Sequence, residues 1–162
     1  MVEARLVRGF NEHDRPAIVA LLREYESGVG ISLCFQDFAG ELAGLPGAYA
    51  PPGGQMLFAA DPGSGGLLGC VAIRPVAGSP QLCEMKRLFV REAGRGTGLG
   101  RRLALAAMEE ARRLGYAAMC LDTLPHMTAA QALYRDLGFR QIGVTTSEPS
   151  VLLFQRALEA AA

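Results

Sequence analysis

The sequence has no net charge, no long apolar run and no pairing pattern among its few cysteines. Its 16 basic and 16 acidic residues cancel, so no overall field attracts nucleic acid or an anionic membrane. No run approaches the roughly 18 apolar residues of a membrane span, and Met1 to Arg5 do not begin an apolar signal peptide. We therefore expect a cytoplasmic protein that has neither nucleic acid nor a membrane as a partner.

The cysteines are too scattered to predict a disulfide framework or a metal site. The sequence has no Cys-x-x-Cys pair, and no histidine stands close to Cys34, Cys70, Cys83 or Cys120. Three of the four fall in apolar runs that resemble strands. We interpret them as buried small hydrophobic residues in a reducing compartment, and we predict no metal ligands.

The composition is that of a folded domain. The chain has 162 residues, of which 50% are hydrophobic and 20% charged, and it contains no internal repeat or low-complexity tract. We predict a single domain over residues 1–162. Hydrophobic periodicity and turn residues predict strands at 4–10, 55–61, 67–75, 81–91, 116–123, 139–144 and 150–158, with helices after Pro16, past the glycine-rich loop and at 125–137.

The order of these elements predicts a mixed sheet. Strands 55–61 and 67–75 form a hairpin that leads into the central strand, so they should pair antiparallel. Strand 116–123 follows a crossover helix and should pair parallel to the central strand. Between the first helix and the hairpin, Phe35, Phe38, Leu42 and Leu45 could form one apolar stripe. That stripe is either core packing or the lining of an acceptor pocket.

A glycine-rich loop between the central strand and the next helix is the feature most specific to function. Gly94, Gly96, Gly98 and Gly100 alternate with other residues, and glycine lets backbone N–H groups turn toward a ligand. The following helix adds its unsatisfied first-turn N–H groups. Nearby cations come from Arg95, Arg101 and Arg102. The loop therefore predicts a site for a pyrophosphate.

Spacing separates three phosphate-binding patterns. A nucleotide-binding P-loop ends in Gly-Lys-Ser/Thr, whereas Gly100 is followed by two arginines. The dinucleotide pattern Gly-x-Gly-x-x-Gly fails because no third glycine falls in register, although Asp122 lies near the distance of a ribose-binding acid. What fits is Arg95-x-x-Gly98-x-Gly100. This resembles the acetyl-CoA pyrophosphate loop of the GNAT N-acetyltransferase superfamily.

A second segment is similar to the same family. Leu121-Asp122-Thr123, followed by residues 129–139 with the ending Leu-Tyr-x-x-x-Gly-Phe, resembles its fifth strand and the helix after it. The resemblance implies an α/β (α+β) fold over 1–162. In it, a central mixed, mostly antiparallel sheet has a splayed parallel strand pair and helices on both faces.

The resemblance also implies the ligand and its contacts. Acetyl-CoA is the expected acyl donor, with its pantetheine arm in the gap of the splayed pair, bonded to one strand. The implied cofactor-binding residues are Leu88, Phe89, Val90, Arg95, Gly96, Thr97, Gly98, Leu99, Gly100 and Arg101. Many relatives carry an asparagine before this last helix, where this chain has Met127, Thr128 and Ala129. Thr128 could replace only one of that amide's hydrogen bonds.

Tyr134 and Glu84 are the candidate catalytic residues. By its place in the motif, Tyr134 is implied to donate a proton to the leaving thiolate; the alternative is a core tyrosine packed on Phe139. Glu84 lies in the neighbourhood where this family often keeps a carboxylate, which makes it a candidate for the base that deprotonates the amine. Its alternative is a salt bridge to Lys86 or Arg87. Strict alternation would place Glu84, Lys86 and Leu88 on one face, opposite Met85, Arg87 and Phe89. His126 is a weaker candidate base.

The resemblance implies an N-acetyltransferase that moves acetyl to a primary amine of a small molecule or peptide. No cysteine stands near the loop or Tyr134 as a nucleophile, so direct attack in a ternary complex is expected. The alternative is a non-catalytic acetyl-CoA-binding regulatory module, which needs the loop but neither Tyr134 nor Glu84. The sequence does not identify the amine, and a homodimer is the default expectation for assembly.

Overall fold

One seven-stranded sheet organises the chain, with strand order β1-β2-β3-β4-β5-β7-β6. The computed structural model describes residues 3–30, 32–33 and 36–159. The strands are β1 (Arg5–Arg8), β2 (Gln55–Ala60), β3 (Leu67–Val76), β4 (Ser79–Val90), β5 (Ala118–Thr123), β6 (Arg140–Val144) and β7 (Leu152–Ala157). The α-helices are α1 (Arg15–Val29), α2 (Phe38–Ala43), α3 (Leu99–Arg113) and α4 (Thr128–Asp136). Short 3₁₀ turns occupy Glu12–Asp14, Gly47–Tyr49 and Glu92–Gly94.

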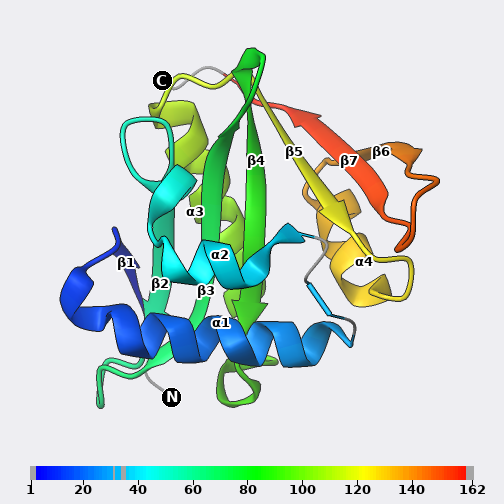
Figure 1. Ribbon diagram of the computed structural model, residues 1–162. Helices are drawn as coiled ribbons and strands as arrows, with labels where there is room; N and C mark the ends of the chain where they lie inside the picture. Colours follow the sequence, from blue (N-terminus) through cyan, green and yellow to red (C-terminus); the bar gives the residue numbers. More distant parts are fainter. Residues whose placement is uncertain (1–2, 31, 34–35, 160–162) are drawn as a thin grey trace.

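All neighbouring strands pair antiparallel except β4 and β5, which pair parallel. Helix α3 is the crossover between these two strands, as the sequence predicted. Helices α1 and α2 cover one face of the sheet and α3 covers the other (Figure 1). The predicted mixed, mostly antiparallel sheet with helices on both faces is confirmed.

The long helices begin and end where local chemistry dictates. Helix α1 has Pro16 in its first turn, where the missing N–H costs nothing, and ends at Gly30 with φ 86°. Helix α3 begins after Gly98 and gives way to Gly115, which also has positive φ. Each buries one apolar stripe against the sheet, so both faces of the sheet are packed.

The sheet separates two cores. On the α3 side, helix residues such as Leu103 and Ala107 pack on Val71 and Met85. On the α1 side, Leu21 and Leu22 pack with residues of α2 and the sheet. The predicted apolar stripe lies in this second core, where Phe38, Leu42 and Leu45 are buried. Phe35 and Cys34 lie outside the described residues.

Differences from the predicted boundaries are small. The helix expected from residue 125 begins at Thr128, because Leu124, Pro125 and His126 form the turn that leads into it. Strand β1 covers only Arg5–Arg8 of the predicted 4–10. In the ranges that the structure describes, no helix is both long and apolar enough to cross a membrane.

Candidate active site

The candidate site lies where β4 and β5 separate. Their parallel pairing covers only Leu82–Glu84 against Ala118–Cys120, and β4 then runs on to Val90 while β5 diverges (Figure 1). A cavity fills the gap, lined from β4 by residues 85–88, from β5 and the turn after it by residues 122–124, and from α4 by Tyr134. The predicted splayed pair is therefore present, and it opens onto a cavity.

A β-bulge in β4 determines which side chains reach this cavity. Arg87 has φ 62°, and the register with β3 shifts between Cys70 and Ala72. The extra residue breaks the alternation. Lys86 and Arg87 consequently both reach partners on the α1 and α2 side, whereas Leu88 packs into the α3 core. The predicted faces of Arg87, Leu88 and Phe89 were wrong for this reason, since Phe89 contacts the Tyr25 ring of α1. The predicted faces of Glu84, Lys86 and Met85 are confirmed.

Arg87 fastens α2 to the bulge. It is 3% exposed, and its guanidinium donates two hydrogen bonds to Glu41, at 2.9 and 2.8 Å. The same group lies over the rings of Phe38, at 4.9 Å, and Tyr25, at 5.5 Å. A buried cation with this bidentate partner holds the wall of the cavity in place.

The glycine-rich loop presents unoccupied main-chain donors. Gly96 and Gly98 have φ of 77° and 79°, and no side chain caps the N-terminus of α3. Its first hydrogen bond runs from the Arg102 N–H to the Gly98 carbonyl. Within the described part of the chain, none of the amides of residues 96–101 has an acceptor. Three of these N–H groups precede α3 and three are in its first turn, and free N–H groups at a helix N-terminus attract anions.

The side chains of the loop stabilise it through hydrogen bonds and an ion pair. Thr97 donates to the Gly94 carbonyl at 2.6 Å, and Arg95 Nε donates to the Val90 carbonyl at 3.0 Å. Arg101 forms an ion pair with Asp136 of α4. Leu99, the first residue of α3, is buried. The predicted cofactor residues are therefore contiguous in space from the end of β4 to the first turn of α3.

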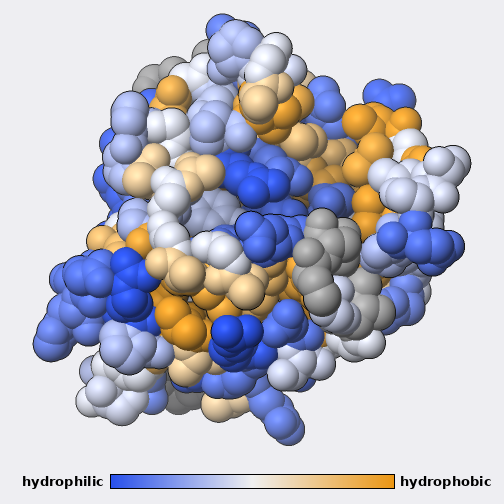
Figure 2. Space-filling view, in the orientation of Figure 1, coloured by the Kyte–Doolittle hydropathy of each residue, from blue (hydrophilic) through white to orange (hydrophobic). Residues whose placement is uncertain are grey.

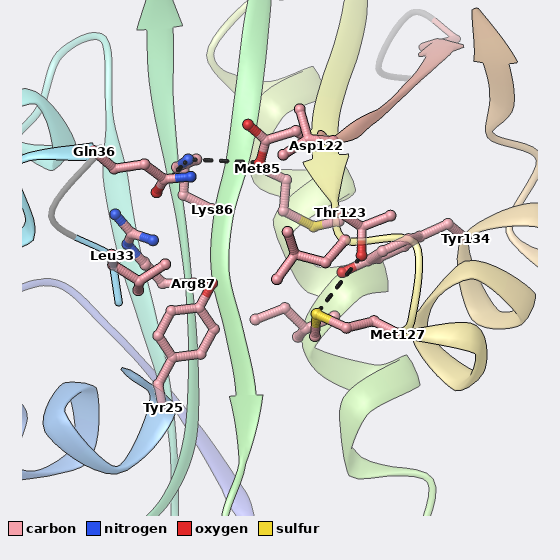
Figure 3. A pocket seen from close by; sticks show the side chains of 13 residues that line it. Tyr25, Leu33, Gln36, Met85, Lys86, Arg87, Asp122, Thr123, Met127 and Tyr134 are labelled. Atoms are coloured by element: carbon pink, nitrogen blue, oxygen red, sulfur yellow. Dashed lines mark hydrogen bonds and ion pairs between the residues drawn. The ribbon is translucent and has the colours of Figure 1, made fainter. Parts of the chain in front are cut away.

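Tyr134 packs against Phe139, as one interpretation expected, and also lines the cavity, so its catalytic role stays a prediction. Its ring packs edge-on against Phe139, at 6.0 Å between centroids, and lies 6.3 Å from Phe154. The residue also lines the cavity, where its hydroxyl points into the gap (Figure 3). Burial raises the pKa of this phenol above its usual value, and Tyr25 and Asp122 raise it further. The Tyr134 hydroxyl therefore carries its proton at neutral pH.

Glu84 lies beside the cavity and has a partner already. Its Oε1 accepts a hydrogen bond from Arg74 Nε at 2.9 Å, and Arg74 Nη2 lies 2.9 Å from the same oxygen as an ion pair. The Lys86 ammonium is farther away, 3.9 Å from Oε2. The alternative of a salt bridge is thus present, with Arg74 as its main partner instead of the predicted Lys86 or Arg87. A catalytic role for Glu84 stays a prediction.

The residues that sequence reasoning missed are Asp122 and Lys86. They extend from β5 and β4 across the gap, with Lys86 Nζ 3.7 Å from Asp122 Oδ1 (Figure 3). Both line the cavity beside Tyr134 and also a second, adjoining hollow that reaches Glu148 and Arg74. Figure 2 shows hydrophilic side chains gathered in the hollow above α2, bordered by hydrophobic ones on the side of α4. The Leu-Asp-Thr segment was the signal for Asp122, because it ends the strand at the gap.

The remaining candidates near α4 have structural partners. The His126 ring nitrogen Nε2 lies 3.0 Å from the Val29 carbonyl at the end of α1. Gln131 is buried and donates to the carbonyls of Leu124 and Pro125, at 3.0 Å each. The Gln131 amide therefore stabilises the turn before α4, which begins at Thr128.

The described cysteines are free thiols whose pKa values are raised. Cys70, Cys83 and Cys120 form no disulfide with one another. Burial raises the pKa of Cys70 and Cys83 to about 12 and that of Cys120 to about 11. None of the three lines the cavity at Tyr134. This arrangement provides no activated thiolate at the gap.

Comparisons with known proteins agree with this geometry. The acetyltransferase (GNAT) family model matches residues 16–139. An uncharacterized N-acetyltransferase of Schizosaccharomyces pombe is 43% identical over 129 residues, which cover 80% of this chain and 75% of that protein. The Escherichia coli N-acetyltransferase YjgM, also uncharacterized, is 31% identical over 143 residues, covering 86% and 84%.

Solved structures share the fold. A GNAT-family acetyltransferase from Staphylococcus aureus Mu50 superposes with a TM-score of 0.78 at 18% identity, covering 96% of this chain and 99% of that one. An aminoglycoside 6′-N-acetyltransferase in complex with coenzyme A gives a TM-score of 0.73 at 17% identity, covering 98% and 99%. The fold, the gap and the relatives together define an acetyltransferase enzyme. The chain belongs to the GNAT N-acetyltransferase family.

Proposed function

We propose that this protein transfers the acetyl group of acetyl-CoA to a primary amine of a small molecule or peptide, by direct attack in a ternary complex. The observation that carries the proposal is the row of six amides without an acceptor at residues 96–101. Strand β4, which lines the cavity with the Tyr134 phenol as far as Leu88, leads into this loop. A neighbour of the same fold was solved with coenzyme A. We also propose that residues 1–162 form one domain and that it assembles as a homodimer.

In this proposal the diphosphate binds the amides of the loop, where the helix dipole adds to their attraction. The pantetheine arm then runs along the edge of β4 that β5 leaves unpaired after Glu84. The main chain of Leu88 and Phe89 would bond it like an added strand. Val90 contributes less, because its carbonyl already accepts the Arg95 Nε.

The chemistry requires one proton donor and one proton acceptor. The amine nitrogen attacks the thioester carbon, and the tetrahedral intermediate collapses by breaking the C–S bond. Tyr134 would give its proton to the departing sulfur, since its pKa is raised and its hydroxyl faces the gap. Asp122 would take the proton of the amine, because it lines the cavity, whereas Glu84 is bound by Arg74. Glu84 remains the second candidate for this base.

Acetyl-CoA binding tests the loop through a matched pair of variants. Gly98 and Gly78 share a φ of 79°, and a Cβ added at either meets no atom within 4 Å. Asp tolerates this backbone conformation better than most residues. Gly98→Asp should therefore fold as Gly78→Asp does, but its carboxylate would repel the diphosphate and weaken acetyl-CoA binding at least about 100-fold. Equal affinity in the two variants would contradict the proposed loop site.

Transfer is tested by thiol release with a panel of amines. The proposal expects acetyl-CoA to raise the unfolding temperature and at least one primary amine to release free coenzyme A. Asp122→Asn and Glu84→Gln, compared at saturating acetyl-CoA, identify the base by which of them loses kcat. Binding of acetyl-CoA without release for any amine would instead favour the regulatory module.

A further inference from the structure

Lys86 is the only lysine in the sequence; every other basic residue is arginine. This single ε-amine borders both the cavity at Tyr134 and the adjoining hollow that reaches Glu148 and Arg74. Its side chain is 5% exposed. A buried lysine is costly unless its charge is used. Its place beside the reaction cavity suggests that the charge acts on a ligand.

The ammonium of Lys86 has donors to spare. It carries three N–H groups, and one of them donates to Gln36 Oε1 at 3.2 Å. The carboxylates of Asp122 and Glu84 lie 3.7 and 3.9 Å away, which is beyond good hydrogen-bond distance. The cation is therefore attracted by two carboxylates without being saturated by either.

The other cations that line the two hollows, among the described residues, are held tightly. Arg74 donates to Glu84 at 2.9 Å, and Arg87 donates twice to Glu41. Arg74 lines only the second hollow, and the Arg87 guanidinium is oriented by its two bonds to Glu41. The compact ammonium of Lys86 borders both hollows and can reorient on its flexible stem. Lys86 is thus the cation available to an incoming anion.

Asp122 offers the opposite charge on the facing strand. Its side chain is 27% exposed and borders both hollows. A positive and a negative group only 3.7 Å apart in one hollow match a ligand that carries both charges itself. A polyamine or aminoglycoside, which is cationic throughout, would bring positive charge against the buried ammonium.

We propose that the acceptor is an amino acid or a similar small amino carboxylate, whose carboxylate binds Lys86 while its amine is directed to Asp122. This inference rests on the acetyl transfer proposed above and adds the substrate class. Lys86 determines specificity and does not take part in bond making. The carboxylate fixes the position of the amine, so that its nitrogen faces the thioester rather than the solvent.

Kinetics on matched acceptors test the proposal. The standard amino acids are compared with their α-amides, which keep the amine and replace the carboxylate by a neutral group. The wild type should prefer the acid about 10- to 100-fold in kcat/KM, as expected for a charge-assisted hydrogen bond. Lys86→Met should abolish that preference through KM, while Arg23→Met, on the exposed face of α1, keeps it. Faster transfer to amides or polyamines, or an unchanged preference in Lys86→Met, would overturn the inference while leaving acetyl transfer intact.

A direct measurement does not depend on turnover. Because Lys86 is the single lysine, lysine labelled with ¹³C at Cε gives one resonance from the protein. Adding an amino acid in the presence of coenzyme A should shift it and raise the pKa that it reports, since a carboxylate stabilises the ammonium. The matching amide should do neither. A resonance that no amino acid shifts, at the concentrations used in the kinetic assay, would also refute the inference.

Discussion

Tyr134→Phe separates catalysis from stability in this protein. The change removes only the hydroxyl, and the ring contacts with Phe139 and Phe154 remain. That hydroxyl makes no hydrogen bond to any residue that the structure describes. The folded state therefore loses little, and we expect the free energy of unfolding to change by less than about 1 kcal/mol.

The expected catalytic effect is much larger. A positioned proton donor contributes about 100- to 10,000-fold to a rate, which corresponds to about 3–5 kcal/mol of the activation barrier. Burial raises the pKa of the phenol, so the wild type has this proton available at neutral pH. We expect kcat to fall by that factor, while the dissociation constant of acetyl-CoA stays within about threefold, because the loop is untouched.

Tyr116→Phe is the matched control. Its hydroxyl donates to the Gly53 carbonyl at 2.5 Å, and the residue does not line the cavity. This variant should lose about 1 kcal/mol of stability, a shift of roughly 2–4 °C in Tm, with kcat unchanged. Thiol release and thermal unfolding of both variants complete the test. If Tyr134→Phe kept full kcat, the phenol would have no role as an acid.

Three further predictions concern charge and burial. Lys86→Met should raise the unfolding temperature at pH 7, because burial lowers the pKa of Lys86 and so disfavours its charged form in the folded state. Relative to this variant, the wild type should gain stability as the pH rises toward about 10.4, the pKa of lysine in the unfolded chain. A lower Tm for Lys86→Met in thermal scans would contradict this. Glu41→Gln should cost about 3–5 kcal/mol by leaving Arg87 buried without its partner. Glu26→Gln, which breaks a solvent-accessible pair of α1 with Arg23, should cost under about 1 kcal/mol. Equal denaturation midpoints would show that the Arg87 contact contributes nothing. The three described thiols, with pKa values of about 11 to 12, should react slowly with a disulfide reagent at pH 8 in the native protein and rapidly after unfolding. Rapid native labelling of any of them, identified by mass, would contradict these raised pKa values.

The sequence predicted what local chemistry controls. Glycines at 96 and 98 adopt the positive φ that their spacing indicated, and α3 begins directly after them. The parallel pair followed from a crossover helix, whose handedness and length leave few alternatives. Tyr134 reached the cavity because its helix follows β5 closely.

What could not be predicted depends on contacts between distant parts of the chain. The bulge at Arg87 inverts the alternation of β4, and its side chain is bound by a glutamate 46 residues away. Glu84 pairs with Arg74 across the β3–β4 ladder instead of with its own neighbours. The pairing of Lys86 with Asp122 depends on the folded sheet, because Asp122 belongs to β5. Strand periodicity cannot detect an inserted residue, and composition cannot assign partners.

The central claim is that the main-chain amides of residues 96–101 bind the diphosphate of acetyl-CoA. Amide ¹H–¹⁵N spectra of the protein, recorded with and without coenzyme A, test it directly. We predict that the largest downfield shifts fall on Gly96, Gly98 and Gly100 and that acetylpantetheine, which lacks the diphosphate, does not produce them. Shifts of equal size with acetylpantetheine, or unchanged resonances at these glycines under saturating coenzyme A, would contradict the account.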